Sequence, residues 1–207
     1  LIYMWRFKTM SHFNFNKKYL IPIVLMFISS IVIFFASLEL SIDSLKIARD
    51  GSVSGNLGCD LGGFLSCSSV MSHSTAEMFG FPNSFLGLVS AGIMITFAVA
   101  LLMKVKFPRL FMFMAQIGYF GGVIYAFILF YISVTAIHFL CPWCLSVQVT
   151  TLIAFFMLLR INILEDNLYL NKSMSNKLKS FCNKGYDLML MVAILVLFLS
   201  VIIINYL

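Results

Sequence analysis

Four of the five cysteines form two pairs whose spacing suits thiol–disulfide chemistry. Cys141 and Cys144 open a long apolar run, whereas Cys59 and Cys67 lie in the one large polar loop. A Cys-x-x-Cys pair on the first helical turn places both sulfurs near free N–H groups and the positive end of the helix dipole, which stabilises thiolate. Pro142 suits the first helical position, so Cys141 is predicted as N-cap and Cys144 as the third helical residue. This division of the cysteines predicts a disulfide relay at a membrane.

The composition indicates a membrane protein. Of 207 residues, 61% are hydrophobic and only 11% are charged, and the mean hydropathy is +1.01. Because crossing a bilayer takes about 20 mostly apolar residues, we looked for runs of that length. Five qualify: 20–38, 84–103, 110–134, 141–163 and 188–206. The predicted fold class is an all-α integral membrane protein, and the first run is expected to be a retained anchor.

The distribution of charge predicts the orientation. Eleven of the 14 Lys and Arg residues lie before the first span, between the second and third, or between the fourth and fifth, and a twelfth, Arg160, lies in the last turn of the fourth span. The positive-inside rule places these segments, with the N-terminus, in the cytoplasm. The paired cysteines then face the outer, oxidising side, whereas Cys182 is expected to be a cytoplasmic bystander. Because this topology accounts for the net charge of +6, no nucleic-acid partner is expected.

Three motifs in order resemble a known family. They are Cys59-x7-Cys67-Ser68, then Phe79-Gly80-Phe81-Pro82-Asn83-Ser84 opening the second span, then Cys141-x-x-Cys144 opening the fourth. Asn83 or Ser84 is expected to cap the second span. This order resembles the vitamin K epoxide reductase (VKOR) family, specifically its bacterial members. The disulfide-forming protein DsbB has a similar relay, but with the cysteine pairs in the opposite order.

The resemblance implies a four-helix bundle around a quinone, either ubiquinone or menaquinone. It implies that Cys144 faces the quinone, that Cys141 exchanges with Cys67, that Cys59 meets a redox partner and that Asn83 contacts the quinone. The implied organisation comprises a cytoplasmic segment (1–19), a catalytic domain (20–163) whose outer loop (39–83) carries a half-helix, a cytoplasmic linker (164–187) and a fifth membrane helix (188–207). Many bacterial members continue into a thioredoxin-like domain; here a separate periplasmic thioredoxin-fold (DsbA-like) partner is expected.

The expected function is that of a DsbB-like thiol:quinone oxidoreductase in the bacterial inner membrane, which supports disulfide bond formation through redox-active disulfides. One alternative is reduction of a quinone or its epoxide as the main activity. Gln148 stands where vertebrate members have a tyrosine of the vitamin K pocket, which weighs against the epoxide. Two non-enzymatic alternatives are a scaffold stapled by static disulfides and a zinc-binding scaffold. The seven-residue gap between Cys59 and Cys67 suits zinc poorly, so no metal site is predicted.

Overall fold

Five helices are long and apolar enough to cross a membrane. The computed structural model describes residues 17–50, 59–60 and 62–206. The five helices are α1 (Lys17–Asp50), α3 (Asn83–Leu102), α4 (Arg109–Ile132), α5 (Pro142–Leu164) and α7 (Tyr186–Tyr206). A π-helical turn, η2 (Ser133–Ile137), extends α4. The predicted all-α membrane fold with five spans is confirmed.

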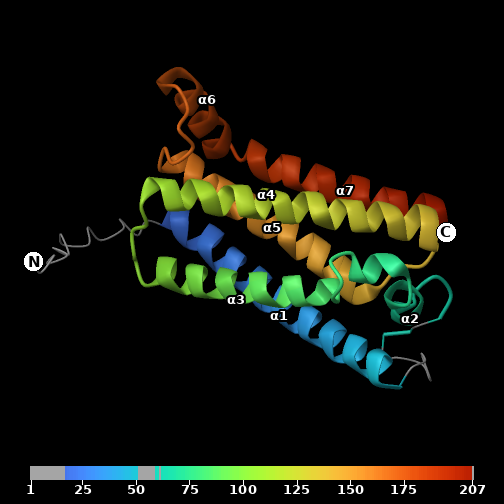
Figure 1. Ribbon diagram of the computed structural model, residues 1–207. Helices are drawn as coiled ribbons and strands as arrows, with labels where there is room; N and C mark the ends of the chain where they lie inside the picture. The colour runs from blue at the N-terminus through green and yellow to red at the C-terminus, as the bar shows by residue number, and fades with distance from the viewer. Residues whose placement is uncertain (1–16, 51–58, 61, 207) are drawn as a thin grey trace, which may run out of the picture.

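Helices α1, α3, α4 and α5 form the central bundle. Helix α1 packs along both α3 and α5, and α4 packs along α5. Helix α7 lies outside this bundle against α5 (Figure 1). The largest buried cluster joins α1 to α5 through side chains such as Met26 and Leu158. Close packing of these buried side chains stabilises the bundle. Many side chains of α7, in contrast, remain exposed.

The predicted outer loop carries two short helical segments. These are α2 (Cys67–Met71) and the 3₁₀ turn η1 (Ser74–Glu77), which together match the expected half-helix. They lie at the opposite end of the bundle from α6 (Lys172–Asn183), a helix inside the predicted cytoplasmic linker (Figure 1). All four paired cysteines therefore lie at one end of the molecule.

Helix α1 continues well beyond residue 38, the predicted end of the first span. The first part of the predicted outer loop (39–83) is helical as far as Asp50. The hydroxyl groups of Ser41 and Ser44 donate to carbonyl groups one turn earlier, and Asp43 pairs with Lys46 at 2.9 Å. These local contacts satisfy the polar side chains without breaking the helix. Residues 51–58 lie outside the described residues.

The start of α7 is tied to the bundle by an ion pair. On α5, the Nη1 atom of Arg160 donates to both carboxylate oxygens of Asp187 at 2.6 and 2.7 Å, and Asp187 is only 4% exposed. A charge-assisted hydrogen bond of this kind is stronger than one between neutral groups. Cys182 is buried beside this pair, and burial raises the pKa of its thiol to about 11. A protonated, buried thiol fits the predicted role of bystander.

A close crossing between α1 and α3 depends on Gly87. A Cβ atom at this position would lie 2.4 Å from Ser37 Oγ and 3.2 Å from Ser37 Cβ. Nearby, the hydroxyl groups of Ser41 and Ser84 form a hydrogen bond, with their Oγ atoms 3.0 Å apart. The small residues thus let the two helices approach closely enough for a hydrogen bond between them.

We therefore predict that Gly87→Ala destabilises the protein by about 1–3 kcal/mol, because the methyl group overpacks a crossing that cannot widen locally. The thermal unfolding midpoint in detergent measures this change. Gly92→Ala on the same helix is the matched control, since its Cβ would meet nothing within 4 Å. Equal midpoints for the two variants would contradict the proposed tight crossing.

Candidate redox site

The start of α5 holds the Cys-x-x-Cys pair as predicted. Cys141 is the N-cap, Pro142 follows at the first helical position, and Cys144 is the third helical residue. The Sγ atom of Cys141 accepts a hydrogen bond from the backbone N–H of Cys144 at 3.4 Å. The sulfur thus takes the place of the side-chain oxygen that normally caps a helix.

A short backbone bridge brings the outer loop to this helix start. The N–H of Leu140 donates to the carbonyl of Phe64 at 2.9 Å, and the N–H of Ser66 donates to the carbonyl of Leu140 at 3.0 Å. Ser66 in turn caps α2, whose first residue is Cys67. The two bonds therefore hold Cys67 beside Cys141, and their Sγ atoms are 3.1 Å apart.

Cys59 and Cys67 are joined in a disulfide, with their Cα atoms 5.8 Å apart. The chain turns back between them through Gly62 and Gly63, which have φ angles of +84° and +62°. Left-handed values of this kind favour glycine, as expected for the predicted foldback. Cys59, Cys67 and Cys141 form a buried cluster with Leu40, and Cys144 packs against it. The structure thus brings all four predicted cysteines together.

The surroundings of Cys141 favour its thiolate. A hydrogen bond from the Cys144 side chain, assisted by the backbone N–H groups of Cys144 and Trp143, holds the pKa of Cys141 below its usual value. Burial and the negative charge of Asp60 oppose this shift. The sequence predicts a stabilised thiolate at both cysteines of the motif, whereas Cys144 acts here as a donor to Cys141. Asp60 also accepts a hydrogen bond from the Ser68 N–H at 3.1 Å.

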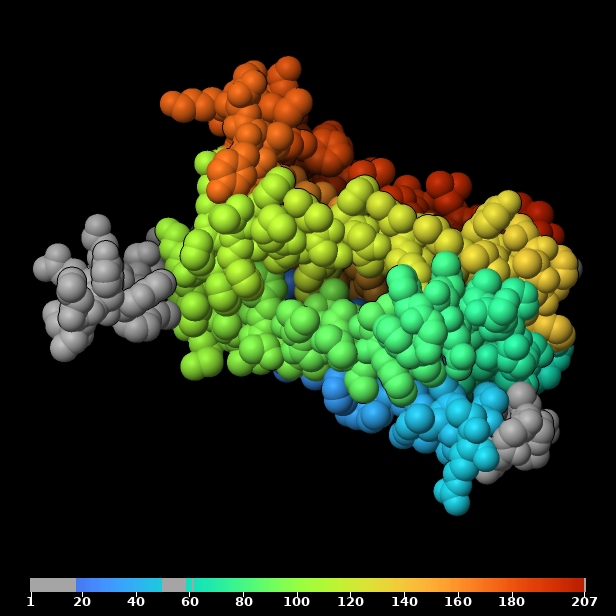
Figure 2. All heavy atoms as spheres, in the orientation of Figure 1, coloured from blue at the N-terminus to red at the C-terminus, as the bar shows by residue number. Residues whose placement is uncertain are grey.

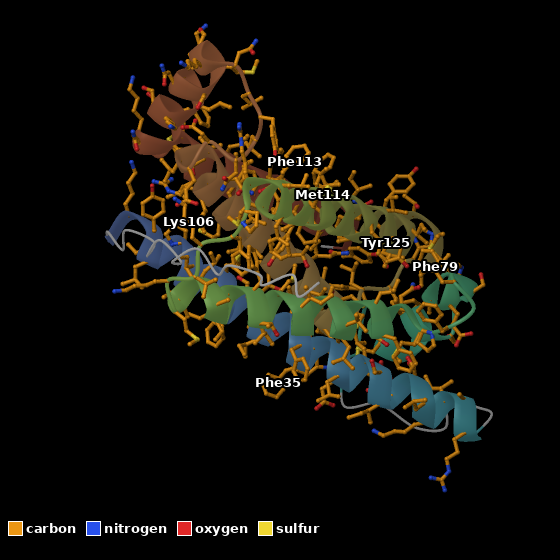
Figure 3. The ribbon with its side chains drawn as sticks, turned by 60° about the vertical axis from the view of Figure 1, so that its left-hand side comes forward. Phe35, Phe79, Lys106, Phe113, Met114 and Tyr125 are labelled. Carbon is orange, nitrogen blue, oxygen red and sulfur yellow. A yellow bond between two sulfur atoms is a disulfide. The ribbon has the colours of Figure 1, made fainter. Side chains whose placement is uncertain are left out.

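A large apolar cavity lies behind Cys144. Its volume is about 650 Å³, and its walls come from all four bundle helices together with α2 and η1. Figure 2 shows the surface hollowed between α3 and α4. Phe79 and Tyr125 contact each other near the outer end of this opening, with ring centroids 6.0 Å apart (Figure 3). The cavity can therefore take a flat ring of apolar character and let an apolar tail pass towards lipid.

Asn83 lies in the cavity wall but does not cap α3. Pro82 is the N-cap residue, and Asn83 is the first helical residue. Its Nδ2 donates to the carbonyl of Thr75 at 2.7 Å, which ties η1 to the start of α3. Its Oδ1 is buried and has no hydrogen-bond partner among the described residues. The capping prediction is wrong for Asn83, whereas its contact with a quinone stays a prediction.

Gln148 is another polar residue of the cavity wall. The resemblance matched its position to the vitamin K pocket of vertebrate members, but its contacts there were not predicted. It lies one turn after Cys144 on α5, and its Nε2 donates to the carbonyl of Ala126 at 2.9 Å. Its Oε1 is buried and, within the described chain, also lacks a partner. The available signal was its spacing: a residue four positions after Cys144 shares that cysteine's helix face.

The fold and the site define a class of protein, namely a multi-pass helical membrane protein in which a disulfide lies against a Cys-x-x-Cys motif beside an apolar cavity. A model of the vitamin K epoxide reductase family matches residues 24–159, which is more than half of the chain. The chain belongs to the vitamin K epoxide reductase family. Members are oxidoreductases with a membrane redox function linked to thiols and quinones, and they typically act with a thioredoxin-like partner. No curated protein matches the chain.

The hydrogen bond between Cys144 and Cys141 predicts a pH effect. In a background lacking Cys59, Cys67 and Cys182, Cys144→Ala should raise the pKa of Cys141, because the donor that stabilises its thiolate is lost. The pH midpoint of Cys141 alkylation then moves upward.

Asp60→Asn provides the opposite test in the same background. It removes a negative charge that raises the pKa of Cys141, while its amide oxygen can still accept from Ser68. The alkylation midpoint should therefore move downward. A shift in the same direction for both variants would contradict this account of the electrostatics.

Proposed function

We propose that the protein is a thiol:quinone oxidoreductase of a bacterial inner membrane. It reoxidises a separate thioredoxin-fold, DsbA-like protein on the periplasmic side and passes two electrons to ubiquinone or menaquinone. The observation that carries this proposal is the 3.1 Å contact between the sulfurs of Cys67 and Cys141. This contact connects a disulfide in the polar loop to a cysteine motif beside an apolar cavity. The charge distribution supports the proposed orientation.

The outer pair exchanges with the partner. A thiolate of the reduced partner attacks Cys59, the disulfide to Cys67 breaks, and Cys67 leaves as a thiolate. The partner's second thiolate then attacks the partner sulfur of the mixed disulfide and releases Cys59. The partner leaves with a disulfide, and Cys59 and Cys67 together hold its two electrons. Each step exchanges one sulfur–sulfur bond for another, so electrons balance throughout.

The inner pair receives these electrons. Cys67 attacks Cys141 of a Cys141–Cys144 disulfide and Cys144 leaves; Cys59 then attacks Cys67 and releases Cys141. The outer disulfide is thereby restored, and the inner pair becomes a dithiol. A bonded outer pair and a free inner pair, as in the structure, are what this step of the proposed relay would produce.

The cavity fits a quinone as the final acceptor. A bound quinone supplies a two-electron, two-proton sink, which returns the inner dithiol to a disulfide. Cys144 and the unpartnered oxygens of Asn83 and Gln148 all belong to the cavity wall. Buried acceptors without a partner are costly, and the hydroxyl groups of the reduced product would satisfy them. The apolar walls and the opening between α3 and α4 suit the rest of the molecule (Figure 2).

The alternative functions fit these observations less well. A zinc scaffold needs the sulfurs of Cys59 and Cys67 as thiolates, but they are bonded to each other. A scaffold with two static disulfides leaves the free inner pair and the adjacent cavity without a role. Reduction of a quinone epoxide remains the second enzymatic candidate, although Gln148 replaces the tyrosine of vertebrate relatives.

The decisive experiment follows quinone absorbance in purified protein supplied with a reduced thioredoxin-fold oxidase. The native protein should consume quinone in step with partner oxidation. Cys141→Ala and Cys144→Ala should each abolish this coupling, because the inner pair links thiol to quinone. Cys182→Ala should keep near-native rates, since Cys182 lies at the other end of the bundle.

Trapping distinguishes the order of transfer. When the oxidised partner is supplied, removing Cys67 should accumulate a mixed disulfide between Cys59 and the partner, because Cys59 attacks the partner's disulfide and no Cys67 thiol remains to resolve the new bond. This species is seen as added mass on a non-reducing gel. Removing Cys144 should accumulate the internal bond between Cys67 and Cys141. Partner trapped only on Cys67 would reverse the assigned roles of the outer pair, and quinone consumption without any of these cysteines would overturn the relay.

The proposed quinone site can be tested separately from the relay. Gly118 on α4 lines the cavity and has open space at its Cβ, so Gly118→Leu should fill part of the site. We expect a roughly tenfold higher KM for quinone, which corresponds to about 1.4 kcal/mol, with exchange between the cysteine pairs unchanged. Gly92→Leu, outside the cavity wall, is the control. An unchanged KM in Gly118→Leu would place quinone elsewhere.

A further inference from the structure

The outer end of α7 packs against the segment that presents Cys67. We propose that Tyr206 is a positioning residue for disulfide exchange between Cys67 and Cys141, acting through Phe64. This proposal rests on the proposed function and adds to it a task for the fifth helix. Figure 1 shows the end of α7 at the same end of the bundle as α2.

The contacts of Tyr206 are specific. Its ring lies 4.9 Å from the ring of Phe64, centroid to centroid, and its hydroxyl donates to the carbonyl of Ser133 at 3.4 Å. One aromatic residue therefore touches both the outer loop and the end of α4. Around it, Phe198 stacks on Phe130 at 4.1 Å, so α7 and α4 share an apolar cluster at this end.

Phe64 transmits this contact to the sulfurs. Its carbonyl accepts the hydrogen bond of the Leu140 N–H, and the Leu140 carbonyl accepts from Ser66. Leu140 precedes Cys141, and Ser66 precedes Cys67. A displaced Phe64 would therefore disturb the two bonds that hold Cys67 beside Cys141.

The other contacts that hold this part of the loop are local or change with redox state. Helix α2 has only five residues, and a helix that short is unstable on its own. It is held by the bond from the Ser68 N–H to Asp60, by packing of Val70 and Met71 against the cysteine cluster, and by the disulfide to Cys59, which changes state in each catalytic cycle. Packing by α7 is independent of the redox state of the cysteines and can hold the loop when that disulfide is open.

The opposite end of α7 makes such support rigid. The ion pair between Arg160 Nη1 and Asp187 holds the start of α7 on α5. Because a continuous helix joins Asp187 to Tyr206, this ion pair limits sliding of Tyr206 along the helix axis. Other side chains near the same end, such as Ile204 with 81% exposure, point away from the protein.

The test measures approach of the two sulfurs without quinone or partner. In a full-length background of Cys59→Ser, Cys144→Ser and Cys182→Ser, mild oxidation with diamide forms the bond between Cys67 and Cys141. Tyr206→Ala should slow its formation by about tenfold, since small displacements of reacting groups cost rate. Tyr206→Phe, which keeps the ring, should remain near the background rate. Ile204→Ala is the matched control and should not change it.

Two further measurements keep the proposal falsifiable. Phe64→Leu should slow bond formation as well, and its effect should not add to that of Tyr206→Ala, because both act on one contact. If Tyr206→Ala fails to fold, Phe64→Leu still tests the positioning role. With all cysteines restored, Tyr206→Ala should lower turnover without raising the KM for quinone.

An unchanged rate of bond formation in folded Tyr206→Ala, or full additivity with Phe64→Leu, would overturn the positioning role. These outcomes are separate from the proposed function. If quinone is not consumed by the native protein but Tyr206→Ala still slows bond formation, the proposed acceptor is wrong and the positioning role stands. If coupling to quinone is intact but Tyr206→Ala is silent in both assays, only the positioning role fails.

Discussion

Two backbone hydrogen bonds between residues 64–66 and Leu140 are the interaction on which the site depends. Cys67 and Cys141 are 74 residues apart in sequence, and disulfide exchange requires their sulfurs to touch. Neither α2 nor the start of α5 alone can bring the two sulfurs into contact, because each element positions only one of the two cysteines. The bridge joins the residues immediately before both cysteines, so any movement of the loop along α5 must first break it.

The membrane restricts where such a bridge can form. Backbone polar groups inside lipid must bond within their own helix, which leaves irregular structure to the ends of the spans. The described non-helical residues beside the cysteines, 62–66 and 138–141, lie at one end of the bundle. The same restriction makes buried polar atoms in the cavity wall important, among them the oxygens of Asn83, Gln148 and Tyr119. Within a mostly apolar space, such groups can orient a polar ring.

Much of this arrangement could be predicted from the sequence, and the failures have physical causes. The length and apolarity of the five runs are sufficient to predict the spans. The N-cap role of Cys141 follows from Pro142 and the apolar run after it. The end of α1 was placed too early because serine back-bonding and the pair between Asp43 and Lys46 keep a polar segment helical. Asn83 or Ser84 was expected to cap α3, but Pro82 takes the cap position, and the Asn83 amide donates to the Thr75 carbonyl across the loop. Such a contact depends on tertiary packing and has no local sequence signal.

The electrostatics of Cys141 favour the direction of the proposed relay. Once Cys67 is bonded to Cys141, that mixed disulfide can be resolved from either side. Attack by Cys59 on Cys67 expels Cys141, and a thiol whose pKa is lowered is the faster leaving group. The hydrogen bond from Cys144 and the N–H groups at the start of α5 lower that pKa. They therefore favour release of Cys141 and closure of the outer disulfide. The two electrons then stay on the cysteine motif beside the cavity, so the cap of one helix helps to move them from the polar loop towards the apolar interior.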